Sequence, residues 1–199
     1  MALAVALVAA AGADAPRGRA MAASADLDGD GRAERIRLLP EAAQPLEVWV
    51  GARLVGRALR REWRPWRLAV ADVDGDGRRD VVVGVRKATR FFPRPHNCLF
   101  VYSVRRGLLA KRWLGSSLSR PFVDFGFIRE RGQRGATLAA LERLPNGRLA
   151  LGAYRWNGFG FTLARTRGSW RAARLQSIAG GRLAVVAGTR RVVVGRMPR

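Results

Sequence analysis

A nine-residue acidic segment occurs twice in this 199-residue chain and constrains its fold more than any other sequence feature. The segment at 26–34 reads DLDGDGRAE and the segment at 72–80 reads DVDGDGRRD, which places their first aspartates 46 residues apart. A period near 50 residues is the size of a propeller blade or of a similar four-stranded repeat. The chain is therefore predicted to consist of repeats of about this length.

Two degenerate copies extend the pattern toward the C-terminus. Residues 119–124 align with 67–72 at an offset of 52 residues, and residues 170–171 align with 66–67 at twice that offset. The third copy keeps only the first aspartate, Asp124, and the fourth copy has no loop carboxylate. These two repeats are expected to retain strands but no metal.

The segments between the acidic motifs have the composition of β-strands. Aliphatic runs at 36–39, 81–85, 138–141 and 183–186 are followed by aromatic segments at 48–50, 100–102 and 154–156 and then by glycine-containing turns. Asn157-Gly158 between aromatic residues indicates a hairpin. Because no sustained helical period occurs, we expect an all-β, β-propeller-like array of about four repeats, each with three to four antiparallel strands. The expected repeats are approximately 20–62, 63–115, 116–166 and 167–199, within one domain over 16–199.

The acidic motif has the chemistry of a site for a hard cation. Aspartates at positions 1, 3 and 5 of a tight turn converge on one ion, and glycines at positions 4 and 6 allow positive φ angles. The carboxylate at position 9 supplies a further ligand. The predicted calcium ligands are Asp26, Asp28, Asp30, Glu34, Asp72, Asp74, Asp76 and Asp80.

The surroundings of the motif exclude an EF-hand. An EF-hand has glutamate at position 12 between two helices, whereas position 12 is Arg37 in the first copy and Val83 in the second. Apolar runs at 68–71 and 81–83 flank the second loop as strands. A dockerin is excluded for the same reason, since its loops lead into helices.

The strand, acidic loop and second strand, at a period near 50, resemble the FG-GAP/VCBS-type repeats of integrin-α-like β-propellers and of many bacterial secreted proteins. The resemblance covers about residues 20–196, with the motif intact at 72–80 and changed at 26–34 only by Glu34. It implies propeller blades, structural calcium and a role in binding or adhesion. Carboxylates that hold calcium are poorly suited to act as catalytic bases.

The chain is strongly basic, with 37 lysines and arginines against 15 aspartates and glutamates and a net charge of +22. All but Lys87 and Lys111 of the basic residues are arginines, and they are spread along the chain. The densest run, at 53–67, is interleaved with Trp63 and Trp66 and has the composition of a patch that clamps an anionic polymer. The competing explanation of the arginine excess is that these residues lie on solvated strand faces and reflect a GC-rich coding bias.

Several function classes are excluded or disfavoured by composition. One cysteine and one histidine exclude an internal disulfide framework and a Cys-rich zinc site, and they disfavour a Ser-His-Asp triad. No run of 18 apolar residues occurs, which excludes a multi-pass membrane protein. The alternative enzyme hypothesis is a glycan-acting hydrolase that uses two of the carboxylates Asp124, Glu130 and Glu142. His96 and Cys98 are interpreted as a turn residue and a buried thiol.

Residues 1–15 are predicted to be a signal peptide, because a short apolar run ends in the small residues Ala11-Gly12-Ala13. The expected location is outside the cytoplasm: secreted, periplasmic or on the cell surface. The sequence thus predicts a non-catalytic exported module with structural calcium that binds a cell-surface polymer, a glycan or a protein. The alternatives are a purely structural propeller domain of a surface assembly and a nucleic-acid or polyanion binder. No membrane span is expected in the mature chain.

Overall fold

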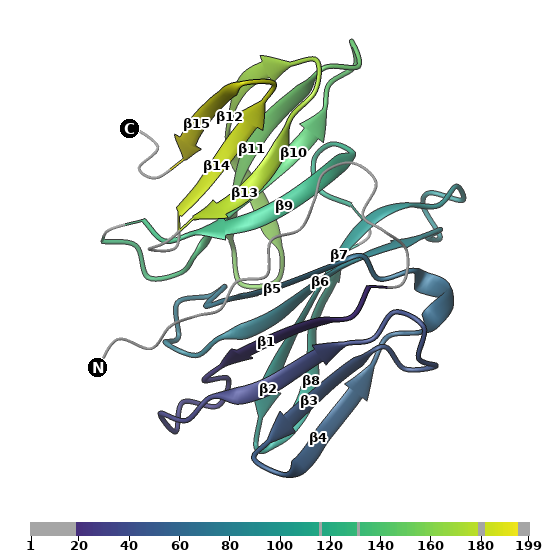
Figure 1. Ribbon diagram of the computed structural model, residues 1–199, viewed down its shortest axis with the longest axis vertical. Coiled ribbons are helices and arrows are strands. Elements are labelled where there is room, and N and C mark those ends of the chain that lie inside the picture. Colours follow the sequence, from purple (N-terminus) through teal and green to yellow (C-terminus); the bar gives the residue numbers. More distant parts are fainter. Residues whose placement is uncertain (1–18, 116, 131, 179–181, 195–199) are drawn as a thin grey trace. The chain divides into compact units, whose positions relative to one another are not determined.

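A computed structural model describes residues 19–115, 117–130, 132–178 and 182–194 (Figure 1). The predicted signal peptide over 1–15 lies outside the described residues. One three-residue 3-10 helix, η1 (Arg61–Trp63), accompanies fifteen strands in the described part of the chain, which confirms the all-β prediction. Within these ranges no helix is both long and apolar enough to cross a membrane.

The strands form four antiparallel sheets in which neighbours in sequence are also neighbours in the sheet. The first sheet contains β1 (Met21–Ala25), β2 (Glu34–Leu38), β3 (Leu46–Val50) and β4 (Arg53–Ala58). The second contains β5 (Arg67–Ala71), β6 (Asp80–Lys87), β7 (His96–Arg105) and β8 (Leu108–Gly115). The third contains β9 (Phe122–Ile128), β10 (Thr137–Arg143), β11 (Leu149–Trp156) and β12 (Phe161–Trp170). The fourth contains β13 (Arg174–Ile178), β14 (Arg182–Ala187) and β15 (Arg190–Val194). Each sheet has the up-and-down order of a propeller blade, as predicted.

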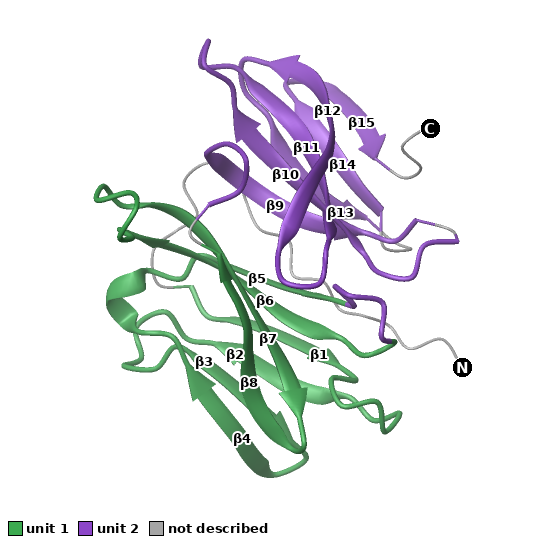
Figure 2. Cartoon of the chain, turned by 180° about the vertical axis from the view of Figure 1, so that it is seen from behind, with its two compact units in different colours: residues 1–8, 16–71, 77–116 green, residues 9–15, 72–76, 117–199 purple. Residues whose placement is uncertain are grey.

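The chain divides into two compact units (Figure 2). The first unit holds the sheets β1–β4 and β5–β8, and the second unit holds β9–β12 and β13–β15. Residues 72–76, the first part of the loop that connects β5 to β6, group with the second unit. Each unit thus contains two blade-like sheets.

A shared apolar core joins the two sheets of the first unit. Strand β2 alternates buried and exposed residues, so that Ile36 and Leu38 point into the core while its arginines face water. Strand β6 is buried at its first six positions, as expected for an inner strand covered on both faces. Its Val83 and Val85 belong to the same core as Phe100 of β7.

The second unit has a smaller core and a buried polar cluster. Leu141 of β10, Leu151 of β11 and Leu175 of β13 belong to one apolar core. The fully buried Glu142 accepts a hydrogen bond from the Tyr154 hydroxyl and lies beside the Arg120 guanidinium. A buried carboxylate requires such partners, because an unpaired charge in the interior is costly. These residues tie β10 to β11 and to the segment before β9.

The strand register defines equivalent positions in the first three sheets. Trp49, Tyr102 and Tyr154 each pair with the second residue of the second strand, namely Arg35, Val81 and Leu138. A register shift between the third and fourth strands directly precedes each of the three aromatic residues. The predicted aromatic strands are therefore true structural repeats. The predicted hairpin at Asn157-Gly158 also forms, between β11 and β12.

The register corrects the alignment of the third copy. The pairs that close the first hairpin of each sheet are Ala25–Glu34, Ala71–Asp80 and Ile128–Thr137. Asp124 therefore does not begin a loop, as the alignment with Asp72 predicted, but lies inside β9. The reason is that β9 begins at Phe122, three positions later than the alignment of Ser119 with Arg67 places it, and has seven residues where β5 has five. The true counterpart of 72–80 is 129–137.

Candidate metal centre

Three loops of equal length connect the first and second strands of the first three sheets. They cover residues 26–33, 72–79 and 129–136. The structure brings carboxylates together in the first two, in the groups Asp26, Asp28, Glu34 and Asp72, Asp74, Asp76. Within each group, ligand oxygens of the three residues lie within 4.8 Å of one another.

The first loop wraps its backbone around Asp26. The two carboxylate oxygens of Asp26 accept hydrogen bonds from the backbone N–H groups of Gly29, at 2.6 Å, and of Gly31, at 3.0 Å. Both glycines have positive φ, 88° and 84°, a conformation that a side chain disfavours. The sequence therefore forms this turn locally, through an aspartate that accepts hydrogen bonds from its own loop and glycines that allow the curvature.

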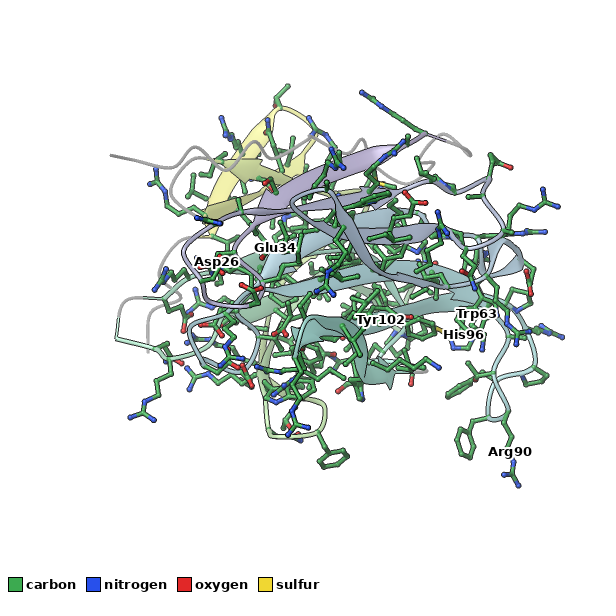
Figure 3. All side chains as sticks on the ribbon, turned by 90° about the horizontal axis from the view of Figure 1, so that it is seen from below. Asp26, Glu34, Trp63, Arg90, His96 and Tyr102 are labelled. Atoms are coloured by element: carbon green, nitrogen blue, oxygen red, sulfur yellow. The ribbon has the colours of Figure 1, made fainter. Side chains whose placement is uncertain are left out.

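Glu34, the first residue of β2, completes the first cluster and lies beside Asp26 (Figure 3). It is only 1% exposed, and its Oε2 accepts the backbone N–H of Leu27 at 2.5 Å. Burial raises the pKa of Glu34, and the negative charges of Asp28, Asp26 and Asp30 raise it further, against the lowering effect of the Leu27 hydrogen bond. A cation at this position offsets both the burial cost and the mutual repulsion.

Asp30 lies outside the three-residue group. It is exposed, and its Oδ1 accepts the backbone N–H of Arg32 at 2.7 Å. Its backbone N–H donates to Oδ1 of Asp28 at 3.2 Å. Asp30 thus stabilises the turn in this structure, and its assignment as a calcium ligand stays a prediction.

The second loop has the same local construction. Oδ1 of Asp72 accepts the N–H of Gly75 at 2.7 Å, and Oδ1 of Asp74 accepts the N–H of Asp76 at 3.3 Å. Gly75 and Gly77 have φ angles of 78° and 89°, matching the glycines of the first loop. The three aspartates at positions 1, 3 and 5 form this cluster as the spacing predicted.

Asp80 takes a different position from its counterpart Glu34. It is buried and is not part of the second carboxylate group, and its Oδ1 accepts a hydrogen bond from the Ser103 hydroxyl at 2.5 Å. In the first sheet the register position of Ser103 is occupied by Val50, which has no hydroxyl. The longer Glu34 reaches its loop, whereas Asp80 binds the third strand of its own sheet. Sequence reasoning missed Ser103, because this contact spans 23 residues.

Backbone hydrogen bonds connect successive loops. The N–H of Arg79 donates to the carbonyl oxygen of Asp26 at 3.1 Å, within the first unit. The N–H of Ala136 donates to the carbonyl oxygen of Asp72 at 2.7 Å, within the second. In both cases the eighth residue of one loop binds the first residue of the preceding loop. The first residue of each acidic loop therefore has two roles, a side-chain carboxylate for the cluster and a carbonyl for the next loop.

The third loop has the same length without the acidic cluster. Arg129 stands where the other loops have their first aspartate, and Gly132 has a φ of 79°, like Gly75. Glu130 forms ion pairs with Arg155 of β11, at 3.6 Å, and Arg165 of β12, at 3.2 Å. Sequence reasoning missed this loop because its charges are reversed. A glycine four residues into a polar segment of the right length is the remaining signal.

The two acidic groups fit calcium by the chemistry of their donors. They offer only carboxylate oxygens and no nitrogen or sulfur, which favours a hard cation. Calcium takes six to eight oxygen ligands, and in the calcium-binding loops of other proteins backbone carbonyls and water supply those that carboxylates do not. Asp26, Asp28 and Glu34 would hold one ion, and Asp72, Asp74 and Asp76 a second.

The carboxylates of the hydrolase hypothesis are engaged in the fold. Asp124 accepts backbone N–H groups of Phe125, at 2.9 Å, and of Leu175, at 3.1 Å, which ties β9 to β13. Glu142 is fully buried against Tyr154, and Glu130 forms its two ion pairs. Each carboxylate therefore has a structural role in the second unit.

Cys98 and His96 are neighbours in space as well as in sequence. Sγ of Cys98 lies 3.5 Å from Nε2 of His96. The thiol is fully buried, and burial raises its pKa against the weaker opposing effect of Lys87. Because the thiolate is the nucleophilic form, this environment disfavours a reactive cysteine.

Comparison with known protein families matches residues 64–89 to the FG-GAP repeat. The matched segment contains β5, the acidic loop 72–79 and β6. A search of curated proteins finds no match to the chain.

Proposed function

We propose that this chain, whose residues 64–89 match the FG-GAP repeat, is an FG-GAP-type repeat protein that acts as a non-catalytic, calcium-stabilised binding module outside the cytoplasm. The observation that carries the proposal is the pair of carboxylate clusters at equivalent turns of successive sheets. Each turn brings ligand oxygens of three acidic side chains within 4.8 Å of one another, and a bound cation would offset their mutual repulsion.

Bound calcium stabilises the folded chain by mass action. At a free concentration 100 times the dissociation constant, one ion adds about 2.7 kcal/mol to the free energy of unfolding. Domains are typically stable by about 5–15 kcal/mol, so the contribution of one site is substantial. Extracellular calcium is millimolar, which saturates the weak sites typical of extracellular modules. This supports a location outside the cytoplasm, in agreement with the predicted signal peptide.

A binding role, rather than a catalytic one, is supported by the engagement of the carboxylates within the protein. The loop carboxylates serve the clusters, while Asp124, Glu130 and Glu142 bind groups of the fold. The proposed partner is a cell-surface polymer, a glycan or a protein. Its attachment is aided by the net charge of +22, which attracts anionic surfaces at low salt.

The test is thermal unfolding of the full chain in 2 mM calcium and in excess EDTA, at fixed ionic strength. Calcium should raise the unfolding midpoint by several degrees, and Asp74→Ala should remove a large part of that gain. Glu41→Gln, which removes an exposed carboxylate elsewhere, should keep the full calcium response. An unchanged midpoint for the parent chain in calcium would overturn the metal part of the proposal.

Partner binding is tested by its salt dependence. Binding to heparin and to nucleic acid that is lost equally steeply with added salt would reflect charge alone. Binding to one glycan or protein that persists at 0.5 M salt would support a specific partner.

A further inference from the structure

The hairpin between β6 and β7 presents two adjacent phenylalanines to solvent. Phe91 is 77% exposed and Phe92 is 49% exposed, whereas Phe100 of the following strand is buried. Exposed large aromatic residues next to each other usually mark an interaction site. Neither the calcium loops nor the proposed function accounts for them.

The tip of this hairpin is a defined turn. The backbone groups of Thr89 and Phe92 exchange two hydrogen bonds, of 2.9 and 3.2 Å, and the Thr89 hydroxyl also accepts the Phe92 N–H at 3.2 Å. Pro93 and Pro95 follow and restrict the returning backbone. The Phe92 ring packs edge-to-face on His96, with 5.2 Å between ring centroids. Phe91 is therefore presented by an ordered turn.

Basic side chains surround the hairpin on two segments. Figure 3 shows Arg90 at the tip and His96 beside Trp63 at the base. The hairpin and the adjoining segment around η1 carry seven basic residues against one acidic residue, Glu62. The basic residues are Arg60, Arg61, Arg64, Arg86, Lys87, Arg90 and Arg94.

A cleft of about 270 Å³ lies where the two segments meet. Three cations, Arg64, Arg86 and Lys87, line it with one carboxylate, Glu62, and with Trp63, Ala88 and Pro95. The Lys87 ammonium lies 5.2 Å from the centroid of the Trp63 ring, within cation–π range. The indole thus helps to hold a cation at the cleft, which suits a phosphate group.

We propose that this end of the first unit binds the surface of a bilayer containing anionic phospholipids. Phe91 and Phe92 enter the boundary between headgroups and acyl chains, and the surrounding cations bind lipid phosphates. Exposed aromatic residues combined with basic residues are the two components of peripheral membrane binding. This inference goes beyond the proposed function and is independent of the calcium loops.

The geometry favours a bilayer over a soluble polyanion. A polyanion requires only the cations, and the two exposed phenylalanines then contribute little. A bilayer uses both, since a projecting tip can bury its aromatic rings while the flanking charges stay at the headgroups. The two rings can bury about 300–500 Å² together, less than the roughly 800 Å² per partner that a stable protein interface requires.

The test is co-sedimentation of the full chain with vesicles of phosphatidylcholine alone or mixed equally with phosphatidylglycerol. The parent chain should bind the mixed vesicles and only weakly those of phosphatidylcholine. Phe91→Ser with Phe92→Ser should lower the partition coefficient about tenfold or more, because burying one large apolar side chain contributes at least about that factor. The matched control is Phe159→Ser, which removes an equally exposed ring (79%) from the β11–β12 turn and should change binding less than about twofold.

Two further measurements separate insertion from charge. Arg90→Gln with Arg94→Gln should weaken binding to mixed vesicles about 25-fold, since each cation near an anionic surface contributes about 1 kcal/mol, or about fivefold. On heparin the double phenylalanine variant should bind as the parent does. Equal binding of parent and double phenylalanine variant to mixed vesicles would overturn the proposal. Equal losses on vesicles and heparin would do the same.

Folding and calcium are controlled separately. Because both phenylalanines are exposed, the double variant should keep the unfolding midpoint and near-ultraviolet circular dichroism of the parent. Vesicle binding is measured in calcium and again in EDTA, below the unfolding midpoint in each buffer. Loss of the calcium effect on unfolding would contradict the proposed function and leave the vesicle result unaffected.

Discussion

The loops 72–80 and 129–137 have the same length and the same place between two strands, yet their charges are opposite. The first gathers three aspartates, and the second begins with Arg129 and has Glu130 as its one carboxylate among the described residues. Glu130 is compensated by Arg155 and Arg165, both supplied by the same sheet. Under the proposed function the first loop takes its cation from solution, whereas the second has two arginines of the protein beside its carboxylate.

The comparison distinguishes the features that both loops share from those that only the acidic loop has. Both loops keep the eight-residue connection, a glycine with positive φ at position 4, and the hydrogen bond between the N–H of Ala136 and the carbonyl of Asp72. The glycine at position 6 is kept only with the acidic cluster: Arg134 stands there in the third loop and is not among the described residues with positive φ. The loop length is therefore common to the acidic and the non-acidic loop, whereas the second glycine occurs only in the acidic loops.

The largest effect is expected from Gly75→Ala. A Cβ at Gly75 would lie 2.6 Å from backbone and side-chain atoms of Arg134 and 2.7 Å from the Gly135 nitrogen, in a backbone conformation that disfavours side chains. Conformational strain and overpacking together should lower the free energy of unfolding by about 2–4 kcal/mol, measured by urea denaturation.

The matched control is Gly77→Ala in the same loop. Gly77 also has positive φ, but an added Cβ meets no atom within 4 Å, so strain alone should cost about 1–2 kcal/mol. Equal losses for the two variants would show that the packing of Gly75 against the third loop contributes nothing.

Glu34→Gln should lower the free energy of unfolding in calcium and should leave it unchanged or raise it in EDTA. In calcium the variant loses a charged ligand, and each tenfold loss of affinity lowers stability by about 1.4 kcal/mol when the site is otherwise saturated. In EDTA the same change removes repulsion from Asp26, Asp28 and Asp30 and should be neutral or stabilising. Unfolding midpoints in both buffers check this reversal, and a loss of equal size in both would contradict it.

Glu130→Gln tests the loop that has its own cations. Loss of the ion pairs with Arg155 and Arg165, which are partly exposed, should lower stability by about 1 kcal/mol. The loss should be the same in calcium and in EDTA. A calcium-dependent loss would place a metal site at the third loop, against the present assignment.

Glu47→Gln removes an ion pair that lies on strands, away from the loops, and serves as a reference for the loop variants. The Arg57 guanidinium, 3.0 Å away, lowers the pKa of Glu47 below its ordinary 4.5, with smaller contributions from Trp49 and Arg37. A lowered folded-state pKa stabilises the protein above the unfolded-state pKa, and this stabilisation is lost as pH falls through the folded-state value. The variant should thus be about 0.5 kcal/mol less stable at pH 7 and equal to the parent in strong acid. A loss independent of pH would indicate packing rather than charge.

The acidic loops and the strands were predictable because their determinants are local. The hydrogen bonds from Gly29 and Gly75 to the first aspartate of each loop span three residues, and the strand periods are visible in short windows. The extent of the third repeat was not predictable in this way. β9 begins three residues later than the alignment places it and is two residues longer than β5, which moves its loop away from Asp124. Only the pairing of Ile128 with Thr137 reveals this.

Long-range packing explains the other features that the sequence did not predict. The contact between Ser103 and Asp80 joins two strands across a hairpin, so that no window around Asp80 contains it. Phe91, Phe92 and Phe100 are the same residue type within ten positions, and only tertiary structure distinguishes the two exposed rings from the buried one.

The most direct test of the central claim is the calcium stoichiometry of the full chain by isothermal titration calorimetry. The parent should bind two ions. Asp26→Asn with Asp28→Asn should bind one, Asp72→Asn with Asp74→Asn should bind one, and Arg129→Ala should still bind two. A parent chain that binds no calcium, or a stoichiometry that either acidic-loop variant leaves unchanged, would contradict the account.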